Sequence, residues 1–358
     1  MKNKAIKTMI IVIICMTALI SFCGCTSGDR SSNGDGKIRV VATIFPEYDW
    51  VREIMGDKAE NADITLLMGN GVDMHSYQPT VDDILKISAC DLFIYVGGES
   101  DEWVEDALEE ATNKDMTVIN LLETLEDLVK EEETVEGMEQ EDEHNDEDEH
   151  DHESKPDDAS EHDHESGHDD HHHSGEIEYD EHVWLSLNNA SVICDRIAEA
   201  LSKLDPENGD AYMSNVKAYK EKLAGLDRSY RDTVRDATVK TLLFGDRFPF
   251  RYMTDDYGLD YYAAFAGCSA ETEASFETIV FLAGKVDELK LPTILTIENS
   301  DRKIAETIKE NTTGKDQKIL AIDSMQSVTQ KDIESGTTYL SIMTDNLRVL
   351  KEALTYEH

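Results

Sequence analysis

Short apolar stretches alternate with helical patterns along most of the chain, and this alternation predicts an α/β fold. Eight apolar runs rich in β-branched residues are predicted to form buried strands. These runs are residues 38–45, 64–68, 92–96, 116–121, 241–244, 261–266, 293–297 and 318–322. Helical patterns begin at Pro46 and Thr80 and recur over 101–111, around Arg251, and over 275–289, 300–311 and 339–354. Strands and helices in this alternation indicate βα units and parallel sheets.

A long helical stretch separates the first four predicted strands from the last four. It runs over residues 187–235, with a break at Pro206. Beyond the break, a single apolar stripe contains Tyr212, Val216, Tyr219, Leu223 and Leu226. We therefore expect two similar lobes with four-stranded parallel sheets, residues 38–186 and 236–358, bridged by a long rigid helix. Ligands of such sheets bind outside the carboxyl ends of the strands, which places a site in the cleft between the lobes.

The charge of the chain is concentrated in one segment of the first lobe. The 358 residues include 33 basic and 77 acidic side chains, for a net charge of -44. Residues 131–181 alone hold 25 acidic side chains against one base, Lys155. Because residues 131–175 show no apolar periodicity, we expect a disordered insert there. A surface with this much negative charge repels phosphate backbones, which argues against a nucleic-acid partner.

The N-terminus has the pattern of an export signal. Three lysines precede an apolar run from Met9 to Ile20, which is shorter than an ordinary membrane-spanning helix. Gly24 and Cys25 follow, and this ending resembles a bacterial lipoprotein signal in which Cys25 is lipidated. We expect a signal peptide over 1–24, a flexible tether over 25–37, and a protein anchored outside the cell membrane. Simple secretion with cleavage nearby is the alternative.

Beyond the signal and Cys25, the cysteines are few and widely spaced. Cys90, Cys194 and Cys268 form neither a disulfide framework nor a metal-binding knuckle. We interpret them as small buried apolar residues, although one pair could be bridged.

Metal-ligating side chains occur in the loops that face the expected cleft. Outside the insert, the chain has three histidines: His75, His182 and the terminal His358. His75 follows the second predicted strand and His182 follows the insert, while Asp246 and Glu298 end strands of the second lobe. Imidazole and carboxylate are the donors that Zn²⁺ and Mn²⁺ use. Each residue could instead have a purely structural role. Glu298 could cap the following helix, and Asp246 could form an ion pair with Arg247.

Two motifs resemble those of the metal-binding solute-binding lipoproteins of ABC transporters, in particular the zinc- and manganese-uptake group. Residues 73–80 (DMHSYQPT) are similar to the family's Asp-Pro-His-x-Tyr-x-Pro-Thr motif, and residues 180–186 (DEHVWLS) to its Asp-Pro-His-x-Trp-Leu-Asp motif. The resemblance runs from about residue 38 to 354. It implies two α/β lobes bridged by a long helix, with His75 and His182 as ligands of a metal buried between them. Tyr77 and Trp184 lie in the same motifs and are expected to surround the ligands.

The chain departs from the family pattern at the third histidine. Arg247 occupies that position, and an arginine keeps its proton and cannot bind a metal. Either Asp246 substitutes for the histidine, or the site has three protein ligands and a water. The family's carboxylate ligand corresponds to Glu298. In the segment 267–271, we expect partners that orient the ligands, with Glu271 orienting a ligand or pairing with Arg247.

The insert contains nine of the 12 histidines, interleaved with acidic residues. The resemblance implies the mobile loop typical of zinc-importing members, so we expect it to capture zinc and pass it to the cleft. A solvated acidic spacer is the alternative. The histidines expected to capture metal are His150, His152, His162, His164, His168, His171, His172 and His173.

Together these features predict an extracytoplasmic, monomeric receptor that binds zinc and delivers it to an ABC permease with its ATPase. Two histidines and two carboxylates also suit Mn²⁺, so a manganese or iron receptor of the same type is an alternative. A zinc-dependent hydrolase with Glu271 as base is a second class, but HExxH spacing is lacking. A surface adhesin or metal buffer without a transporter is a third.

Overall fold

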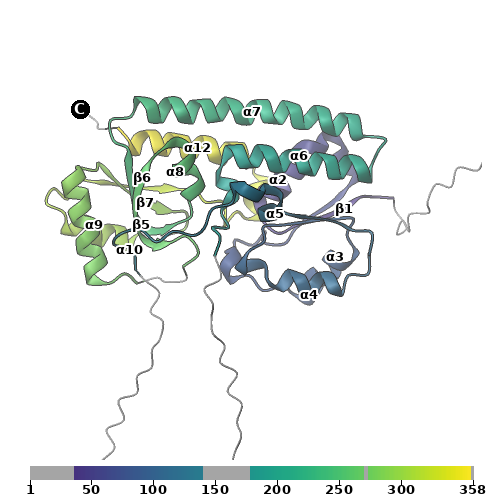
Figure 1. Cartoon of the computed structure of the whole chain (residues 1–358), viewed down its shortest axis with the longest axis horizontal. Helices are drawn as coiled ribbons and strands as arrows, with labels where there is room; N and C mark the ends of the chain where they lie inside the picture. The colour runs from purple at the N-terminus through teal and green to yellow at the C-terminus, as the bar shows by residue number, and fades with distance from the viewer. Residues whose placement is uncertain (1–35, 140–177, 270–272, 356–358) are drawn as a thin grey trace, which may run out of the picture. The chain divides into compact units, whose positions relative to one another are not determined.

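The computed structural model describes residues 36–139, 178–269 and 273–355, and it contains two parallel four-stranded sheets (Figure 1). The first sheet has the order β2-β1-β3-β4 and the second β6-β5-β7-β8. Their strands are β1 (Arg39–Ala42), β2 (Asp63–Leu66), β3 (Leu92–Tyr95), β4 (Thr117–Asn120), β5 (Thr241–Phe248), β6 (Asp260–Ala266), β7 (Thr293–Ile297) and β8 (Lys318–Ile322). All eight lie where the sequence predicts strands, and the predicted two-lobed α/β fold is confirmed.

Helices cover the sheets of both lobes, and most of them lie where the periodicity predicts. The first lobe has α2 (Phe45–Met55), α3 (Val81–Ala89), α4 (Trp103–Glu109) and α5 (Leu121–Leu125). The second has α8 (Arg251–Tyr257), α9 (Phe276–Leu289), α10 (Lys303–Asn311), α11 (Gln330–Glu334) and α12 (Tyr339–Ala353). Helices α5 and α11 are not predicted from the sequence, because five residues are too few to show a helical period.

Local capping sets the starts of two helices of the first lobe, α2 and α3. Thr80 accepts a hydrogen bond from Asp83 N–H, and the Asp83 carboxylate accepts one from Thr80 N–H at 3.0 Å, so the predicted capping box is present. At α2, the carboxylate of Glu47 takes the same role and accepts from the N–H groups of Thr43 and Ile44. Unlike Asp83, Glu47 is completely buried.

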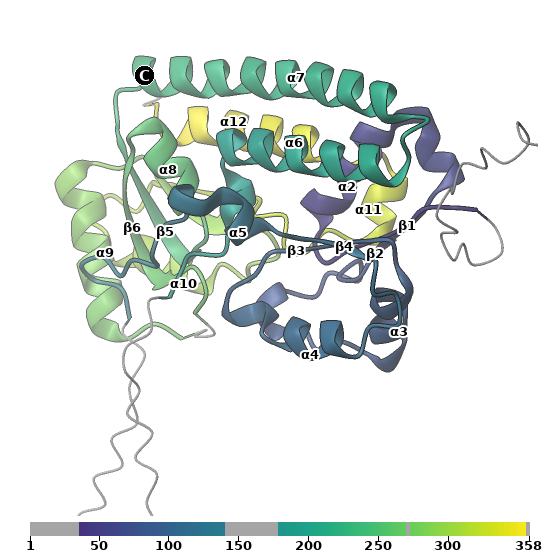
Figure 2. The ribbon, with the colours of Figure 1, turned by 45° about the vertical axis from the view of Figure 1, so that its right-hand side comes forward.

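Two helices form the predicted bridge between the lobes. They are α6 (Leu187–Leu204) and α7 (Gly209–Asp236), separated at Pro206 as the sequence predicts. The 28 residues of α7 span about 42 Å at 1.5 Å per residue. Helix α7 packs on α2 and α6 at one end and on α8 and α12 at the other (Figure 2). A single hydrophobic cluster runs from Val40 to Leu354, so the two lobes share a core.

Residues 129–139, here called the strap, lie against the second lobe although they follow the sheet of the first. Lys130 N–H donates to the Tyr252 hydroxyl at 3.0 Å, and Glu139 N–H donates to Ala264 C=O at 2.9 Å. Met138 is buried, and Glu131 forms an antiparallel bridge with Tyr179. Residues 131–139 were expected to belong to the disordered insert, and the structure gives them defined contacts instead.

Several predicted features lie outside the described residues. They are the signal peptide, Cys25 and its tether up to residue 35, the remaining part of the insert with its nine histidines, Glu271, and the terminal His358. Within the part of the chain that the structure describes, no helix is long and apolar enough to cross a bilayer.

Candidate metal site

The two histidines singled out from the sequence meet in the structure. The Nε2 atoms of His75 and His182 lie 3.2 Å apart, although the residues are separated by 107 positions. His75 lies in a short 3₁₀ turn (Met74–Ser76), where the Asp73 carboxylate accepts its N–H at 3.1 Å. His182 directly precedes a second 3₁₀ turn (Val183–Leu185). Two short turns far apart in the sequence therefore direct both rings to one point.

Asp180 fixes the orientation and tautomer of His182. One carboxylate oxygen, Oδ1, accepts the His182 backbone N–H at 2.9 Å and lies 3.0 Å from ring Nδ1. Because a carboxylate oxygen accepts, Nδ1 carries the hydrogen and Nε2 keeps its lone pair. The ring itself is fully buried. Metal-binding histidines are oriented by carboxylates in this way.

The Nδ1 side of His75 is also occupied, by Ser100 Oγ at 2.8 Å and by Glu181 Oε2 at 3.5 Å. Burial, and secondarily the nearby His182, lower the pKa of His75 to about 3. The imidazole is therefore neutral near pH 7 and available to bind a cation.

The distance between the two rings suits a shared metal ion. Two imidazole nitrogens bound to one tetrahedral zinc, each at about 2.0–2.1 Å, lie about 3.3 Å apart. The observed separation of 3.2 Å matches that edge. The pair can thus accept a dication without large rearrangement.

The loop that contains His182 is held by the second lobe. The Tyr252 hydroxyl donates to Asp180 C=O at 2.7 Å, and Trp184 Nε1–H donates to Ser324 C=O at 2.8 Å. The Tyr339 hydroxyl donates to Trp184 C=O at 2.7 Å. Trp184 therefore links the loop to the second lobe rather than only surrounding the ligand.

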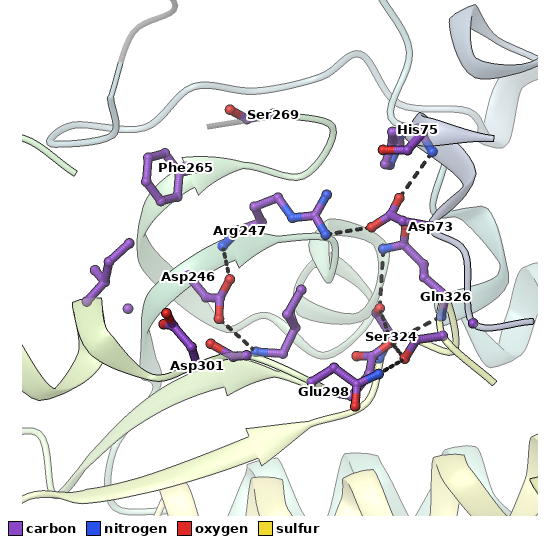
Figure 3. A pocket seen from close by; sticks show the side chains of 18 residues that line it. Asp73, His75, Asp246, Arg247, Phe265, Ser269, Glu298, Asp301, Ser324 and Gln326 are labelled. Carbon is purple, nitrogen blue, oxygen red and sulfur yellow. Dashed lines mark hydrogen bonds and ion pairs between the residues drawn. The ribbon is translucent and has the colours of Figure 1, made fainter. Parts of the chain in front are cut away.

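A cavity of about 510 Å³ lies beside His75 and is lined by both lobes (Figure 3). The first lobe contributes Asp73 and His75, and the second contributes Asp246, Arg247 and Glu298. Three of the four predicted ligands, His75, Asp246 and Glu298, thus face a common space between the lobes, whereas His182 does not line it.

The two predicted carboxylate ligands are occupied by hydrogen bonds within the second lobe. Glu298 accepts from Ser324 N–H at 2.7 Å, from the Ser324 hydroxyl at 2.8 Å and from Gln326 N–H at 3.1 Å. Asp246 accepts from Arg247 N–H at 2.9 Å and from Ile297 N–H at 3.4 Å (Figure 3). Asp246 thus links β5 to the end of β7, and Glu298 links the end of β7 to the segment after β8. Among the described residues, neither carboxylate falls into one group with the two histidines.

Arg247, which the sequence resemblance predicts to stand at the family's third histidine, forms an ion pair across the cleft. Its guanidinium lies 2.6 Å from Oδ2 of Asp73, a residue of the first lobe (Figure 3). Burial alone would raise the pKa of Asp73, but the charge of Arg247 outweighs it and the pKa is lowered. Asp73 therefore stays ionised and holds both the His75 turn and the opposite lobe. Tyr77 is directed elsewhere and donates to Asp83 at 3.0 Å.

Cys268 completes a group of three donor residues, although the sequence pattern predicts a small buried apolar residue at this position. Among the described residues, donor atoms of His75, His182 and Cys268 all lie within 4.8 Å of one another. Cys90 and Cys194 are buried free thiols, as expected, but Cys268 is only partly buried. Burial, together with the carboxylates of Glu132 and Asp180, raises the pKa of the Cys268 thiol. The available signal was its position just after the strand 261–266, where ligands of parallel sheets gather.

Comparison with known proteins identifies relatives whose names describe zinc binding or zinc uptake. The zinc-binding lipoprotein AdcA of Streptococcus pneumoniae is 28% identical over 328 residues, which make up 92% of this chain and 58% of AdcA. The chain therefore spans little more than half the length of that relative. The high-affinity zinc uptake system protein ZnuA of Bacillus subtilis is 29% identical over 345 residues and 96% of each chain.

A solved structure confirms the likeness of the fold. The Zn(II)-bound ZnuA-like domain of Streptococcus pneumoniae AdcA superposes with a TM-score of 0.64 at 26% identity, over 90% of this chain and all of that domain. The family model of ZnuA, described as zinc-uptake complex component A periplasmic, matches residues 40–353. The resemblance expected from the two histidine motifs is thus confirmed, and the chain belongs to the ZnuA family of periplasmic zinc-uptake components.

Proposed function

We propose that this protein is an extracytoplasmic receptor that binds one zinc ion between its lobes and delivers it to an ABC permease with its ATPase. The observation that carries the proposal is the 3.2 Å approach of the two Nε2 atoms of His75 and His182. Both rings have their Nδ1 atoms occupied by oxygen atoms, so both Nε2 atoms are left for a cation. The names of two relatives, a zinc-binding lipoprotein and a zinc uptake protein, support zinc as the bound ion.

The lobes are suited to closing on an ion and to releasing it. His182 belongs to a loop fixed to the second lobe by Tyr252 and Trp184, whereas His75 belongs to a turn of the first lobe. A metal that joins these two rings therefore stabilises one arrangement of the lobes. Release requires that the permease favour another arrangement. The proposal assigns no catalytic step to the site.

The proposal extends to features outside the described residues. Lipidated Cys25 would tether the monomeric protein to the outer face of the membrane through residues 25–37. The histidines of the insert would collect zinc near the site, because Glu131 and Tyr179, which lie before and after these histidines in the sequence, form an antiparallel bridge close to His182 in the chain. Asp246 and Glu298 stay predicted ligands, and either one would have to give up its present hydrogen bonds to bind the ion.

A zinc titration against a chromogenic chelator tests the proposal. We expect the full chain to show one tight site, and His75→Ala and His182→Ala each to weaken it at least about 100-fold, because each removes a ligand. His358→Ala is the matched control and should retain the tight site. Tight binding that survives in the His75→Ala/His182→Ala double variant would overturn the proposal.

A further inference from the structure

We propose that Cys268 is the third protein ligand of the cleft metal, bound as a thiolate where the family pattern has a histidine. The inference rests on the proposed zinc binding and specifies the donors that make it. Arg247 stands at the position of the missing histidine, and its guanidinium is engaged with Asp73. A third donor must therefore come from another element.

The geometry brings the sulfur to the two imidazoles. Cys268 lies in the turn that follows β6, at the carboxyl edge of the second sheet. Its sulfur and the ring nitrogens of His75 and His182 lie within 4.8 Å of one another. A tetrahedral zinc with two nitrogens at about 2.0–2.1 Å and a sulfur at about 2.3 Å spaces nitrogen and sulfur about 3.6 Å apart. A movement of at most about 1.2 Å in the turn, the difference between 4.8 Å and about 3.6 Å, brings all three donors to one ion.

Gly267 allows this turn to approach His182. A Cβ at position 267 would lie 2.9 Å from the Phe248 carbonyl oxygen and 3.1 Å from Cε1 of His182. A residue with a side chain would therefore push the turn away from the imidazole. The absence of a side chain at 267 is what lets the next residue reach the two rings.

Contacts on the other side hold the turn in place. The backbone N–H of Cys268 donates to Glu132 Oε1, on the strap, at 3.1 Å. The strap is itself held to the second lobe through Tyr252 and Ala264. The backbone of Cys268 is thus held from β6 on one side and from the strap on the other.

A buried carboxylate oxygen beside the group also points to a cation. Oε2 of Glu181 is buried without a hydrogen-bond partner and lies 3.5 Å from His75 Nδ1. Buried polar atoms are normally satisfied, and an unsatisfied one calls for an explanation. A dication on the far side of the His75 ring makes Nδ1–H a stronger donor toward Ser100 and Glu181, and so supplies the missing interaction.

A thiolate changes the chemistry of the site. Zinc displaces the thiol proton, which leaves to solvent, and the Zn–S bond forms in its place. Two imidazoles and a thiolate form a softer donor set than two imidazoles and two carboxylates. Soft ligands favour zinc, and oxygen ligands favour manganese. The inference thus predicts discrimination against Mn²⁺ by the site itself.

Cobalt substitution provides the test. Co²⁺ bound by a thiolate absorbs in the near ultraviolet, and Co²⁺ bound by imidazole and carboxylate alone lacks this charge-transfer band. The insert contains many histidines but no cysteine, so bound cobalt there does not contribute. We expect the full-length chain to show the band at one equivalent, Cys268→Ser to lose it, and the matched control Cys90→Ser to retain it.

Affinity and a rescue variant separate this inference from the proposed function. We expect Cys268→Ser to weaken zinc binding at least about tenfold. Cys268→His should restore affinity without the near-ultraviolet band. If wild type binds one zinc tightly through His75 and His182 but shows no band, and Cys268→Ser binds equally well, the thiolate is excluded while the receptor function stands. If His75→Ala/His182→Ala still binds tightly, the receptor site itself is wrong.

Discussion

The Arg247 guanidinium in the second lobe contacts the Asp73 carboxylate in the first lobe at 2.6 Å. Because Asp73 also caps the turn of His75, this ion pair connects the opposite lobe to a proposed ligand. We expect Arg247→Gln to speed zinc release about fivefold, corresponding to about 1 kcal/mol for a partly exposed charged pair. Stopped-flow release into a chelator measures the rate.

The matched control for this change is Arg235→Gln, which removes an exposed arginine paired with Asp232 and Asp236 on α7. That variant should release zinc at the wild-type rate. The difference between the two variants should shrink as salt is added, because the pair is partly exposed and screened. Equal release rates in both variants at low salt would show that the Arg247–Asp73 contact does not hold the closed cleft.

Asp180 gives a second prediction, because it orients His182 without belonging to the ligand group. Asp180→Asn replaces the acceptor at Nδ1 by a group that can also donate, which permits the wrong tautomer at Nε2. We expect zinc affinity to fall about 10- to 100-fold, as for other partners of metal-binding histidines. Competition titration gives the affinity, and thermal unfolding without metal checks that the fold persists. Unchanged affinity in a folded Asp180→Asn protein would contradict this role.

Gly267 and Gly284 form a matched pair for testing close approach at the site. A Cβ at Gly267 meets the Phe248 carbonyl and the His182 ring, whereas a Cβ at Gly284 on α9 meets nothing within 4 Å. We expect Gly267→Ala to lower zinc affinity about tenfold or more, since the strain of about 1–3 kcal/mol displaces the turn. Gly284→Ala should bind normally and gain about 0.5–1 kcal/mol of stability, as helical alanine replaces glycine. Chemical denaturation measures the stability of both variants, and zinc titration measures their affinity. Equal zinc affinity in the two variants would contradict the close approach of the turn to His182.

Glu47 predicts a pH dependence of stability. Burial, and then the charge of Asp101, raise the pKa of Glu47 to about 8. A carboxyl whose pKa is raised by folding stabilises the protein fully below its unfolded value near 4.3, and that stability is lost as pH rises through about 8. Glu47→Gln removes the ionisation and retains an acceptor for Thr43 and Ile44. Relative to this variant, the wild type should lose up to about 1.4 kcal/mol per pH unit between pH 6 and 8.

Denaturant unfolding in the presence of a chelator measures this difference without interference from bound zinc. Glu47→Ala, which also removes the acceptor, should be less stable than Glu47→Gln at every pH. Stability curves of wild type and Glu47→Gln that run parallel from pH 6 to 8 would refute the assignment of a raised pKa to this group.

The strap and the insert can be tested separately by deletion. Replacing residues 140–177 with a short Gly-Ser linker should remove weak zinc equivalents and leave one tight site, since residues 131–139 keep their contacts. Replacing 131–177 also removes Glu132, which accepts the Cys268 N–H, and should weaken the tight site. Isothermal titration counts both classes of site. Loss of tight binding in the shorter deletion would mean that the insert itself is the site.

Local patterns determine the fold class and single out two of the proposed ligands, His75 and His182. The eight strands, the Thr80–Asp83 capping box and the break at Pro206 depend on periods and caps of a few residues, and these are visible in sequence. His75 and His182 were identified because each lies in a motif of about seven residues. Their meeting followed from the resemblance, not from any local pattern.

Tertiary packing decided the remainder. The sequence shows neither that Arg247 pairs with Asp73, 174 positions away, nor that Cys268 lies beside the two imidazoles. A cysteine after a strand is compatible with a buried apolar residue and equally with a metal ligand. An acidic segment such as 131–139 predicts a solvated loop. The role of each side chain depends on which residues the fold places next to it. In this protein, β6 and the strap lie beside the histidines of the first lobe.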